Sequence, residues 1–156
     1  MIPPFLFRRA EARDAALLTA IALAAKRHWG YPDDWMEAWR PDLTVTPGYI
    51  QREAVQVMEV GGEVAGFVGL LGEEGSLYLE HLWLRPPHIG RGFGRVLFLE
   101  AVRMARAAGA SELRIKSDPN AEEFYLKMGA VRTGSEAYLL LGRFPREVPL
   151  LVYRLS

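Results

Sequence analysis

The stretch SLYLEHLWLRPPHIGRGFGRVLFLEA, residues 76–101, decides the fold. Its first residues alternate as a β-strand does, and Pro86 and Pro87 end that strand because proline has no N–H group to give to a sheet. Glycine then recurs at positions 90, 92 and 94, and apolar residues follow at helical spacing up to Gly109, a typical helix end. A glycine turn between a strand and a helix leaves free N–H groups at the positive end of the helix dipole. The stretch therefore predicts an anion-binding loop, for which phosphate is the commonest ligand.

Strict alternation along this strand also predicts which side chains share a face of the sheet. One face is expected to carry Leu77, Leu79 and Trp83, and the other Tyr78, Glu80, Leu82 and Leu84. On this prediction Glu80 lies on the face of Leu82, and His81 points to the opposite face.

Two common phosphate loops do not fit the glycine turn. The dinucleotide fingerprint would need a third glycine at position 95, where Arg95 stands, and the Walker loop needs Gly-Lys followed by Ser or Thr, which the chain lacks. A general nucleotide-binding domain is therefore disfavoured. The turn reads Gly-x-Gly-x-Gly with Arg91 and Arg95 beside it, and the alternative is an ordinary glycine-rich turn before a helix.

Length and composition limit the class of protein. A chain of 156 residues, half of them hydrophobic, is expected to form a single globular domain over residues 1–156. Nineteen basic residues balance nineteen acidic ones, so no overall charge attracts nucleic acid or an anionic membrane. Without cysteine, disulfides and thiolate chemistry are excluded. No apolar run reaches membrane-spanning length and no cleavable leader is recognisable, so a cytoplasmic location is expected.

The order of elements predicts an α+β fold. Strands are expected over 5–9, 55–60, 64–71, 76–85, 113–116, 132–141 and 149–155. Helices are expected over 11–28, 46–52, 93–109 and 121–128, with a further short helix capped by Asp33 or Asp34. The Gly-Gly pair at 61–62 between two apolar runs is a strong hairpin signal. This order indicates one central mixed sheet with helices on its faces.

A second chemical stretch, SDPNAEEFYLKMGA, covers residues 117–130. Asn120 stands at the end of a predicted strand, where its amide can bond a peptide-like chain passing alongside or simply cap the next helix. Tyr125 follows on that helix, where its phenol can face a ligand or pack in the core beside Phe124. Each feature alone is modest evidence, and their order along the chain is what gives them weight.

Together the two stretches resemble the GNAT N-acetyltransferase superfamily, over residues 54–131. Gly92-Phe93-Gly94 matches the end of the family's acyl-CoA pyrophosphate loop, with Ile89 where Gln or Arg is usual, and Ala130 replaces a usual Phe after Gly129. The resemblance implies a three-layer fold with a mostly antiparallel sheet, and acetyl-CoA as co-substrate without a metal. The residues that it assigns to acetyl-CoA are Leu82, Trp83, Leu84, Ile89, Gly90, Arg91, Gly92, Phe93, Gly94, Arg95, Asn120, Tyr125 and Lys127.

The resemblance also implies a mechanism. The strand over 76–85 should bulge or splay from its neighbour, so that free N–H and C=O groups near Leu82 and Leu84 pair with pantetheine and polarise the thioester carbonyl. Glu80 is the expected base for the amine, directly or through water, and Tyr125 the expected acid for the departing thiolate. His81 has the better intrinsic pKa for a base, but strand alternation turns it away. No histidine has metal-ligand spacing, so no metal site is expected.

The acceptor is expected to be a primary amine, either a small molecule or the N-terminus or a lysine of a protein. The resemblance assigns Trp29, Tyr31 and Glu80 to its pocket, near His28, Trp35, Trp39, Arg143 and Arg146. These aromatic rings could hold an apolar or cationic amine, or could simply cover the sheet. A non-catalytic acyl-CoA-binding module is the alternative function, against which Glu80 and Tyr125 both argue. A homodimer is left open.

Overall fold

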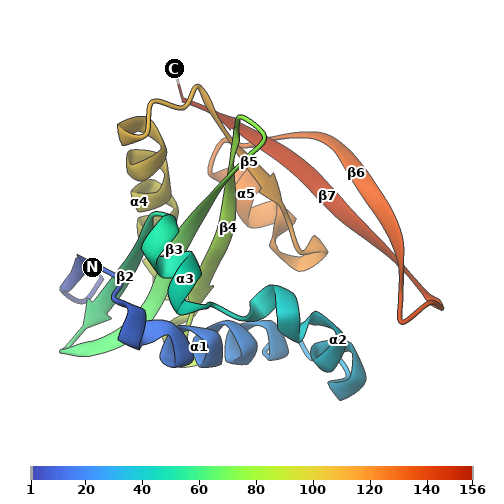
Figure 1. Cartoon of the computed structure of the whole chain (residues 1–156), viewed down its shortest axis with the longest axis horizontal. Coiled ribbons are helices and arrows are strands. Elements are labelled where there is room, and N and C mark those ends of the chain that lie inside the picture. Colours follow the sequence, from blue (N-terminus) through green and yellow to red (C-terminus); the bar gives the residue numbers. More distant parts are fainter. Residues whose placement is uncertain (1, 156) are drawn as a thin grey trace.

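A computed structural model describes residues 2–155 of the chain (Figure 1). This part forms a seven-stranded sheet in the order β1-β2-β3-β4-β5-β7-β6. Its strands are β1 (Phe5–Arg9), β2 (Val55–Val60), β3 (Glu63–Glu73), β4 (Ser76–Leu84), β5 (Glu112–Lys116), β6 (Val131–Leu140) and β7 (Phe144–Arg154). Its α-helices are α1 (Ala15–Arg27), α2 (Asp33–Leu43), α3 (Pro47–Arg52), α4 (Phe93–Ala107) and α5 (Glu122–Lys127). Three short 3₁₀ turns complete the fold. The turn η1 (Ala12–Asp14) precedes α1, η2 (Pro86–His88) precedes the loop before α4, and η3 (Pro119–Ala121) precedes α5.

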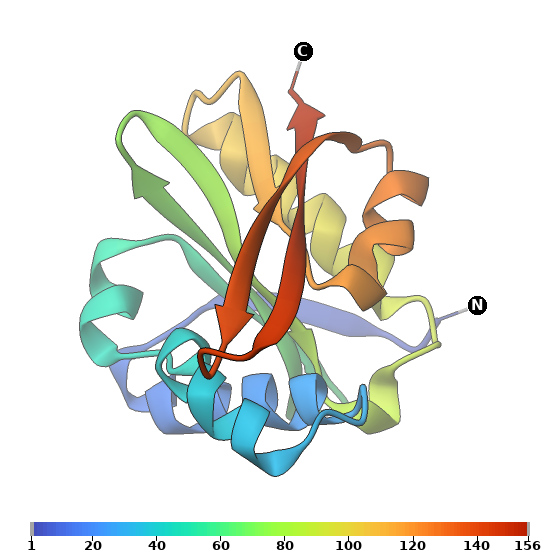
Figure 2. The same cartoon turned by 90° about the vertical axis from the view of Figure 1, so that its right-hand side faces the viewer.

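The sheet is buried on both faces by helices, which confirms the predicted α+β fold. Neighbouring residues of one strand belong to different cores: Val57 packs with α1, α2 and α3, whereas Met58 packs with α4 and α5. Figures 1 and 2 show α1 and α2 on one side of the sheet and α4 on the other. All strand pairs are antiparallel except β4 with β5. No helix among residues 2–155 is long and apolar enough to cross a membrane.

The last strand begins earlier than the sequence predicts, at Phe144 instead of Pro149. The sequence prediction places a loop before Pro149, whereas the strand in the structure includes both Pro145 and Pro149. The structure accommodates them because β5 pairs only with Leu150–Arg154, so the earlier half of β7 bonds to β6 alone. A proline there faces no second strand that needs its N–H group. The longer strand carries the β6–β7 hairpin well past the end of β5, as Figure 1 shows.

The strands β4 and β5 splay apart. They share one paired position, Tyr78 with Arg114, while β4 stays paired with β3 along its whole length. From Leu79 to Leu84 the β5-facing edge of β4 therefore has no strand beside it. We call this gap the sheet opening. It is the splay that the sequence prediction required, and it leaves backbone N–H and C=O groups free to bond an extended ligand.

A bulge in β4 overturns the predicted alternation of side chains. Gly69 of β3 pairs with His81 and Leu70 pairs with Leu79, so Glu80 is the extra residue of the bulge. Leu79 and Leu82 consequently pack in the same core, under α4, although they are three positions apart. The predictions that Trp83 shares the face of Leu79, and that Glu80 shares the face of Leu82, are therefore wrong: Trp83 packs against the α1–α3 side.

Tyr49 of α3 stands directly against this bulge. Its hydroxyl donates a 2.8 Å hydrogen bond to the carbonyl oxygen of Leu70, and its ring lies edge-on to the His81 ring at 5.5 Å. A Cβ atom at position 69 would lie 2.4 Å from the Tyr49 hydroxyl. Glycine at 69 is therefore what lets Tyr49 approach the irregular pairing and bond the backbone there.

Candidate active site

The glycine loop of the sequence prediction leads into α4. Gly90 and Gly92 both have positive φ, 80° and 91°, which glycine adopts without strain. Gly92 is the residue before the helix, no side chain caps that end, and the first turn holds no acidic residue. The N–H groups of the first turn therefore have neither a helical partner nor a capping side chain. This is the arrangement that binds an anion at a helix N-terminus.

The loop's side chains differ in what they can offer a ligand. Ile89, Arg91 and Arg95 are exposed, so both arginines can add positive charge to the anion site. Phe93 is fully buried and can contribute only its backbone N–H group. Gly94 faces the ring of Phe124, to which an added Cβ would come within 3.3 Å.

The predicted base, Glu80, lies at the bulge beside the sheet opening. Its side chain is exposed, yet partial burial of the carboxyl, followed by the negative charges of Asp42 and Glu73, raises its pKa above the ordinary value for glutamate. Burial, followed by the negative charge of Glu80, in turn raises the pKa of Tyr49. A raised pKa brings a carboxylate nearer to the range in which a general base works best.

His81 is poorly placed to act as that base. It is 4% exposed, and burial lowers the pKa of its imidazole to about 4. Its Nδ1 accepts a 3.0 Å hydrogen bond from the indole Nε1 of Trp83, which can only donate, so this nitrogen carries no proton and its lone pair is occupied. Burial and the hydrogen bond from Trp83 therefore exclude His81 as the base. The sequence excluded it for another reason, the alternation of side chains along the strand.

The predicted acid, Tyr125, lies on α5 between Phe98 and Phe124, whose ring centroids are 5.9 Å and 5.2 Å from its own. It is 8% exposed, and its hydroxyl forms no hydrogen bond with any other residue among 2–155. Burial, followed by the negative charge of Asp118, raises the pKa of its phenol. The phenol therefore stays protonated at neutral pH, as an acid must.

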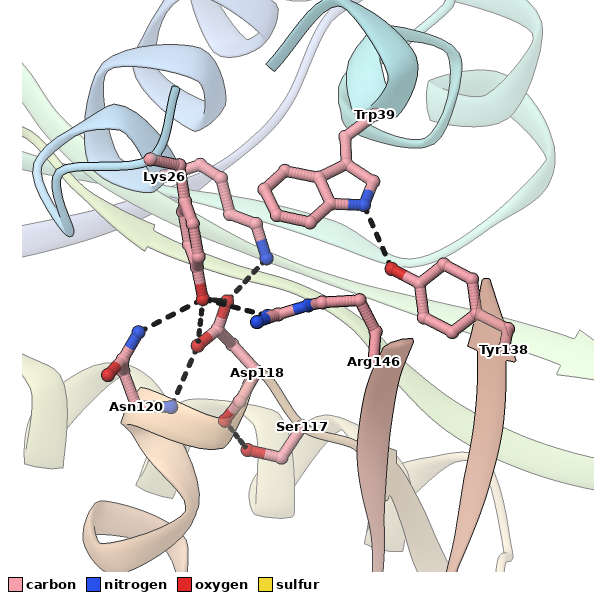
Figure 3. A network of polar contacts seen from close by, with 8 residues as sticks. Lys26, Trp39, Ser117, Asp118, Asn120, Tyr138 and Arg146 are labelled. Carbon is pink, nitrogen blue, oxygen red and sulfur yellow. Dashed lines mark hydrogen bonds and ion pairs between the residues drawn. The ribbon is translucent and has the colours of Figure 1, made fainter. Parts of the chain in front are cut away.

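A polar network that the sequence did not suggest joins α1, the loop before α2, the segment after β5 and the strand β7 (Figure 3). Lys26 of α1 donates a 2.5 Å hydrogen bond to Asp118, and the Tyr31 hydroxyl donates to the same carboxylate at 2.9 Å. Tyr31 also accepts from the Asn120 amide at 3.0 Å and from Arg146 at 3.1 Å. Burial alone would raise the pKa of Asp118, but the charge and hydrogen bond of Lys26 outweigh it and lower that pKa.

Aromatic residues just before α2 and within it pack around this network. Tyr31 stacks on Trp35 at 5.9 Å and meets Trp39 edge-on at 4.7 Å. Lys26 lies 4.4 Å from the Trp39 ring, and the Arg146 guanidinium lies 5.2–5.6 Å from the Tyr31, Trp35 and Trp39 rings. Trp29 is 46% exposed and, among the described residues, makes none of these contacts.

A cavity of about 130 Å³ lies beside the network, between α1, α2 and the strands β5, β6 and β7. Lys26, Trp39, Lys116, Asp118, Tyr138 and Arg146 contribute to its wall. In Figure 3 the Lys26 side chain reaches Asp118, whereas the Arg146 side chain ends at the Tyr31 hydroxyl beside it. A larger open depression of about 660 Å³ lies at the other end of β4, against the β3–β4 turn and the α4–β5 loop, and its lining includes no residue of the glycine loop or of the polar network.

These features can be compared with known proteins. A family model described as the Acetyltransferase (GNAT) family matches residues 17–130, well over half of the chain. The chain belongs to this family. It is a GNAT acetyltransferase, and acetyl-CoA is its co-substrate. A comparison with curated proteins found no significant match.

Solved structures of other GNAT proteins share the fold. A GCN5-related N-acetyltransferase structure from Rhodopseudomonas palustris is similar over 99% of this chain and 98% of that one, with a TM-score of 0.83 and 23% identity. The PaiA N-acetyltransferase of Thermoplasma acidophilum, solved with coenzyme A, is similar over 97% and 99%, with a TM-score of 0.78 and 18% identity. YncA of Salmonella typhimurium, solved with acetyl-CoA, gives 0.68 and 20% identity over 98% and 95%.

In this GNAT acetyltransferase the structure brings most of the predicted site residues to one place. Glu80 and the backbone of Leu82–Leu84 line the sheet opening, the glycine loop stands where β4 ends, and Asn120 with Tyr125 stands beyond β5. Lys127 is exposed at the end of α5. Lys26 and Asp118 were missed because they are 92 positions apart. The one usable signal was Ser-Asp-Pro-Asn directly after a strand, where Asp118 also accepts from the Asn120 N–H group at 2.8 Å.

Proposed function

We propose that this GNAT acetyltransferase moves the acetyl group of acetyl-CoA directly to a primary amine while both are bound. The observation that supports this most is the free edge of β4, which begins at the bulge of Glu80 and continues toward the uncapped N-terminus of α4. One short stretch of chain thus offers a carboxylate, a free backbone edge and an anion site. The amine belongs to a small molecule, or is the N-terminus or a lysine of a protein.

Acetyl-CoA would lie along this stretch. Its pyrophosphate suits the free N–H groups of the loop and first turn, with Arg91 and Arg95 adding charge. Its pantetheine arm suits the backbone groups of Leu82 and Leu84, which no neighbouring strand engages on that edge. Asn120 stands on the opposite wall, and its side-chain oxygen has no partner among the described residues, so it can accept a bond from an amide of the arm.

The protein's own groups then supply the chemistry. Glu80 takes the proton that the acceptor amine must lose, directly or through one water. An N–H group near Leu82 donates to the thioester oxygen, where negative charge develops during attack. Tyr125 donates its proton toward the departing sulfur. Tyr31 and Trp29 would border the acceptor, Tyr31 from within the network and Trp29 from its exposed outer side.

The proposal is tested by thiol release. With acetyl-CoA and a panel of amines, we expect CoA thiol to appear only when an amine is present, together with the N-acetylated product by mass spectrometry. Binding of acetyl-CoA, seen as a raised melting temperature, with no thiol release from any amine would contradict the proposal and favour a non-catalytic acyl-CoA-binding module.

Gly92→Val should weaken acetyl-CoA binding about 10- to 100-fold, the loss expected for one or two charge-assisted hydrogen bonds. Valine is strained at a φ of 91°, and its Cβ atom would come within 2.8 Å of the Ile2 side chain, so the loop must shift and its N–H groups leave the positions from which they bind the pyrophosphate. Gly109→Val is the control for backbone strain alone, because Gly109 has a similar φ of 79°, lies beyond the other end of α4, and its added Cβ atom would meet no atom within 4 Å. Calorimetric titration should show weak binding in Gly92→Val alone. Equal acetyl-CoA affinities in the two variants would show that the pyrophosphate does not bind at this loop.

A further inference from the structure

The cavity beside the polar network has an excess of positive charge. Three of its side chains are cationic, Lys26, Lys116 and Arg146, and one is anionic, Asp118. The charge of Asp118 is already engaged, because Lys26 lies 2.5 Å from it and both side chains are largely buried. The two remaining cations therefore determine the sign of the potential inside the cavity.

Arg146 is the cation that lacks an ionic partner. Among residues 2–155 no carboxylate lies within 4.0 Å of its guanidinium, which donates instead to the neutral hydroxyl of Tyr31. Its Nε is buried and has no hydrogen-bond partner in the described part of the chain. A half-buried guanidinium with an unpaired N–H donor is energetically unfavourable, and a bound anion would supply the missing acceptor and charge. The planar pair of N–H donors on a guanidinium matches the two oxygens of a carboxylate best.

The aromatic rings do not offer an alternative site for a cationic acceptor. The protein's own cations already lie against them, since Lys26 contacts the Trp39 ring and Arg146 contacts Tyr31, Trp35 and Trp39. A second cation brought to these faces would be repelled by both side chains. The cluster is therefore a support that holds Arg146 in place and not an open aromatic cage.

The opposite pole of the site is acidic. Glu80 at the bulge is close enough to Asp42 and Glu73 for their negative charges to act on it, and Lys116 acts on it with the opposite sign. Lys116 also lines the cavity, so it links the two poles. Its own partner, Glu136, is 3.8 Å away and half exposed, which makes a weak pair. An acceptor that spans the site thus meets the Glu80 carboxylate at one end and the Arg146 guanidinium at the other.

Resting on the proposed function, we propose that the acceptor is an amino acid or a related amine that carries a carboxylate. Arg146 binds the carboxylate in the cavity, with Lys116 beside it, and the amino group faces Glu80. An amine without an acidic group leaves Arg146 uncompensated, and a polyamine is repelled by it. The cavity of about 130 Å³ suits a small molecule.

The test compares pairs of acceptors that differ only in the carboxylate: each of a panel of L-amino acids against the amine left on its decarboxylation. With acetyl-CoA, the wild type should give a kcat/KM at least tenfold higher for the amino acid of the preferred pair. Arg146→Gln should lower this value about 10- to 100-fold and leave the decarboxylated amine nearly unchanged, because only the carboxylate loses charge-assisted bonds. Arg146→Lys keeps the positive charge but loses the paired N–H donors, so its kcat/KM for the amino acid should lie between those of the wild type and Arg146→Gln.

Arg143→Gln is the matched control: the sequence prediction put Arg143 near the pocket, but in the structure it lies in the β6–β7 turn, rests on the Phe144 ring at 4.6 Å and does not line the cavity. It should behave as wild type. Calorimetric binding of the amino acid to the complex with CoA, with melting temperatures of every variant, separates lost recognition from lost folding.

The outcomes separate the two proposals. This inference is overturned if the decarboxylated amines are acetylated as well as the amino acids, or if folded Arg146→Gln keeps the preference of the wild type. The proposed function stays intact in both cases. No thiol release from any amine would overturn the proposed function. In that case calorimetry still decides the inference, since binding of the amino acid but not of its decarboxylated counterpart supports a carboxylate site, and equal or absent binding of both refutes it.

Discussion

Glu80→Gln is expected to lower kcat/KM for the acceptor amine by about 100- to 10,000-fold, the usual range for loss of a general base. Glutamine keeps the size of the side chain and its hydrogen-bonding atoms but cannot take a proton. Acetyl-CoA affinity should stay nearly unchanged, because the bulge that Glu80 occupies is held by the pairing of β3 with β4 and by Tyr49. The rate loss should therefore appear without a matching loss of cofactor binding.

The same variant has a signature in the pH profile. Burial, Asp42 and Glu73 raise the pKa of Glu80, so the carboxylate needed for proton removal forms only at higher pH than in an ordinary glutamate. For the wild type, kcat/KM should rise with pH through that ionisation. In Glu80→Gln the rise should disappear, leaving only the ionisation of the amine itself. Two acceptors with different amine pKa values distinguish the two ionisations.

His81→Gln is the control for the neighbouring titratable group. Because the pKa of His81 is lowered to about 4 and its Nδ1 accepts from Trp83, its removal should leave the ionisation of kcat/KM in place. Rates of His81→Gln are normalised to the concentration of folded enzyme, because His81 packs between Tyr49 and Phe67 and its replacement affects folding. Loss of the ionisation in His81→Gln, with its survival in Glu80→Gln, would reassign the base to His81.

The fold was predictable because its signals are local. The hairpin of β2 and β3 follows from a Gly-Gly pair between apolar runs, and the anion site before α4 follows from glycines after a proline-terminated strand. Each signal involves residues within one turn of each other, where backbone sterics dominate. The candidate site was predictable to the same extent: the loop, Asn120 and Tyr125 stand on such local patterns.

What was not predictable depends on contacts between distant parts of the chain. The bulge at Glu80 is invisible in an alternating strand, because its cause includes Tyr49, which bonds the Leu70 carbonyl from another element. One extra residue was enough to reverse the faces of Trp83 and Leu79 relative to each other. The Lys26–Asp118 pair is equally hidden, since charged residues are common along a chain and only the fold selects which two meet. The polar network around Asp118 depends almost wholly on such long-range contacts.

Tyr125→Phe is expected to lower kcat about 10- to 1,000-fold while leaving the affinity for acetyl-CoA nearly intact. The ring packs between Phe98 and Phe124, and phenylalanine preserves that packing, whereas the hydroxyl, which has no partner among residues 2–155, is removed. The lost interaction is one made with the departing sulfur as charge develops on it, so kcat should fall and not the dissociation constant of acetyl-CoA. Transient kinetics of thiol release, with calorimetric binding of acetyl-CoA, measures the two separately.

The raised pKa of Tyr125 gives this prediction its pH dependence. A raised pKa extends the range in which the phenol keeps its proton, so the wild type should show no alkaline decline of kcat from Tyr125 below about pH 10, the ordinary tyrosine value. Tyr153→Phe is the matched control, because it removes a hydroxyl from another ring packed against Phe98, at 5.2 Å, and should leave kcat unchanged. If Tyr125→Phe instead abolishes acetyl-CoA binding and leaves turnover per bound enzyme unaltered, Tyr125 is a packing residue, and the proton for the sulfur must come from water in the sheet opening.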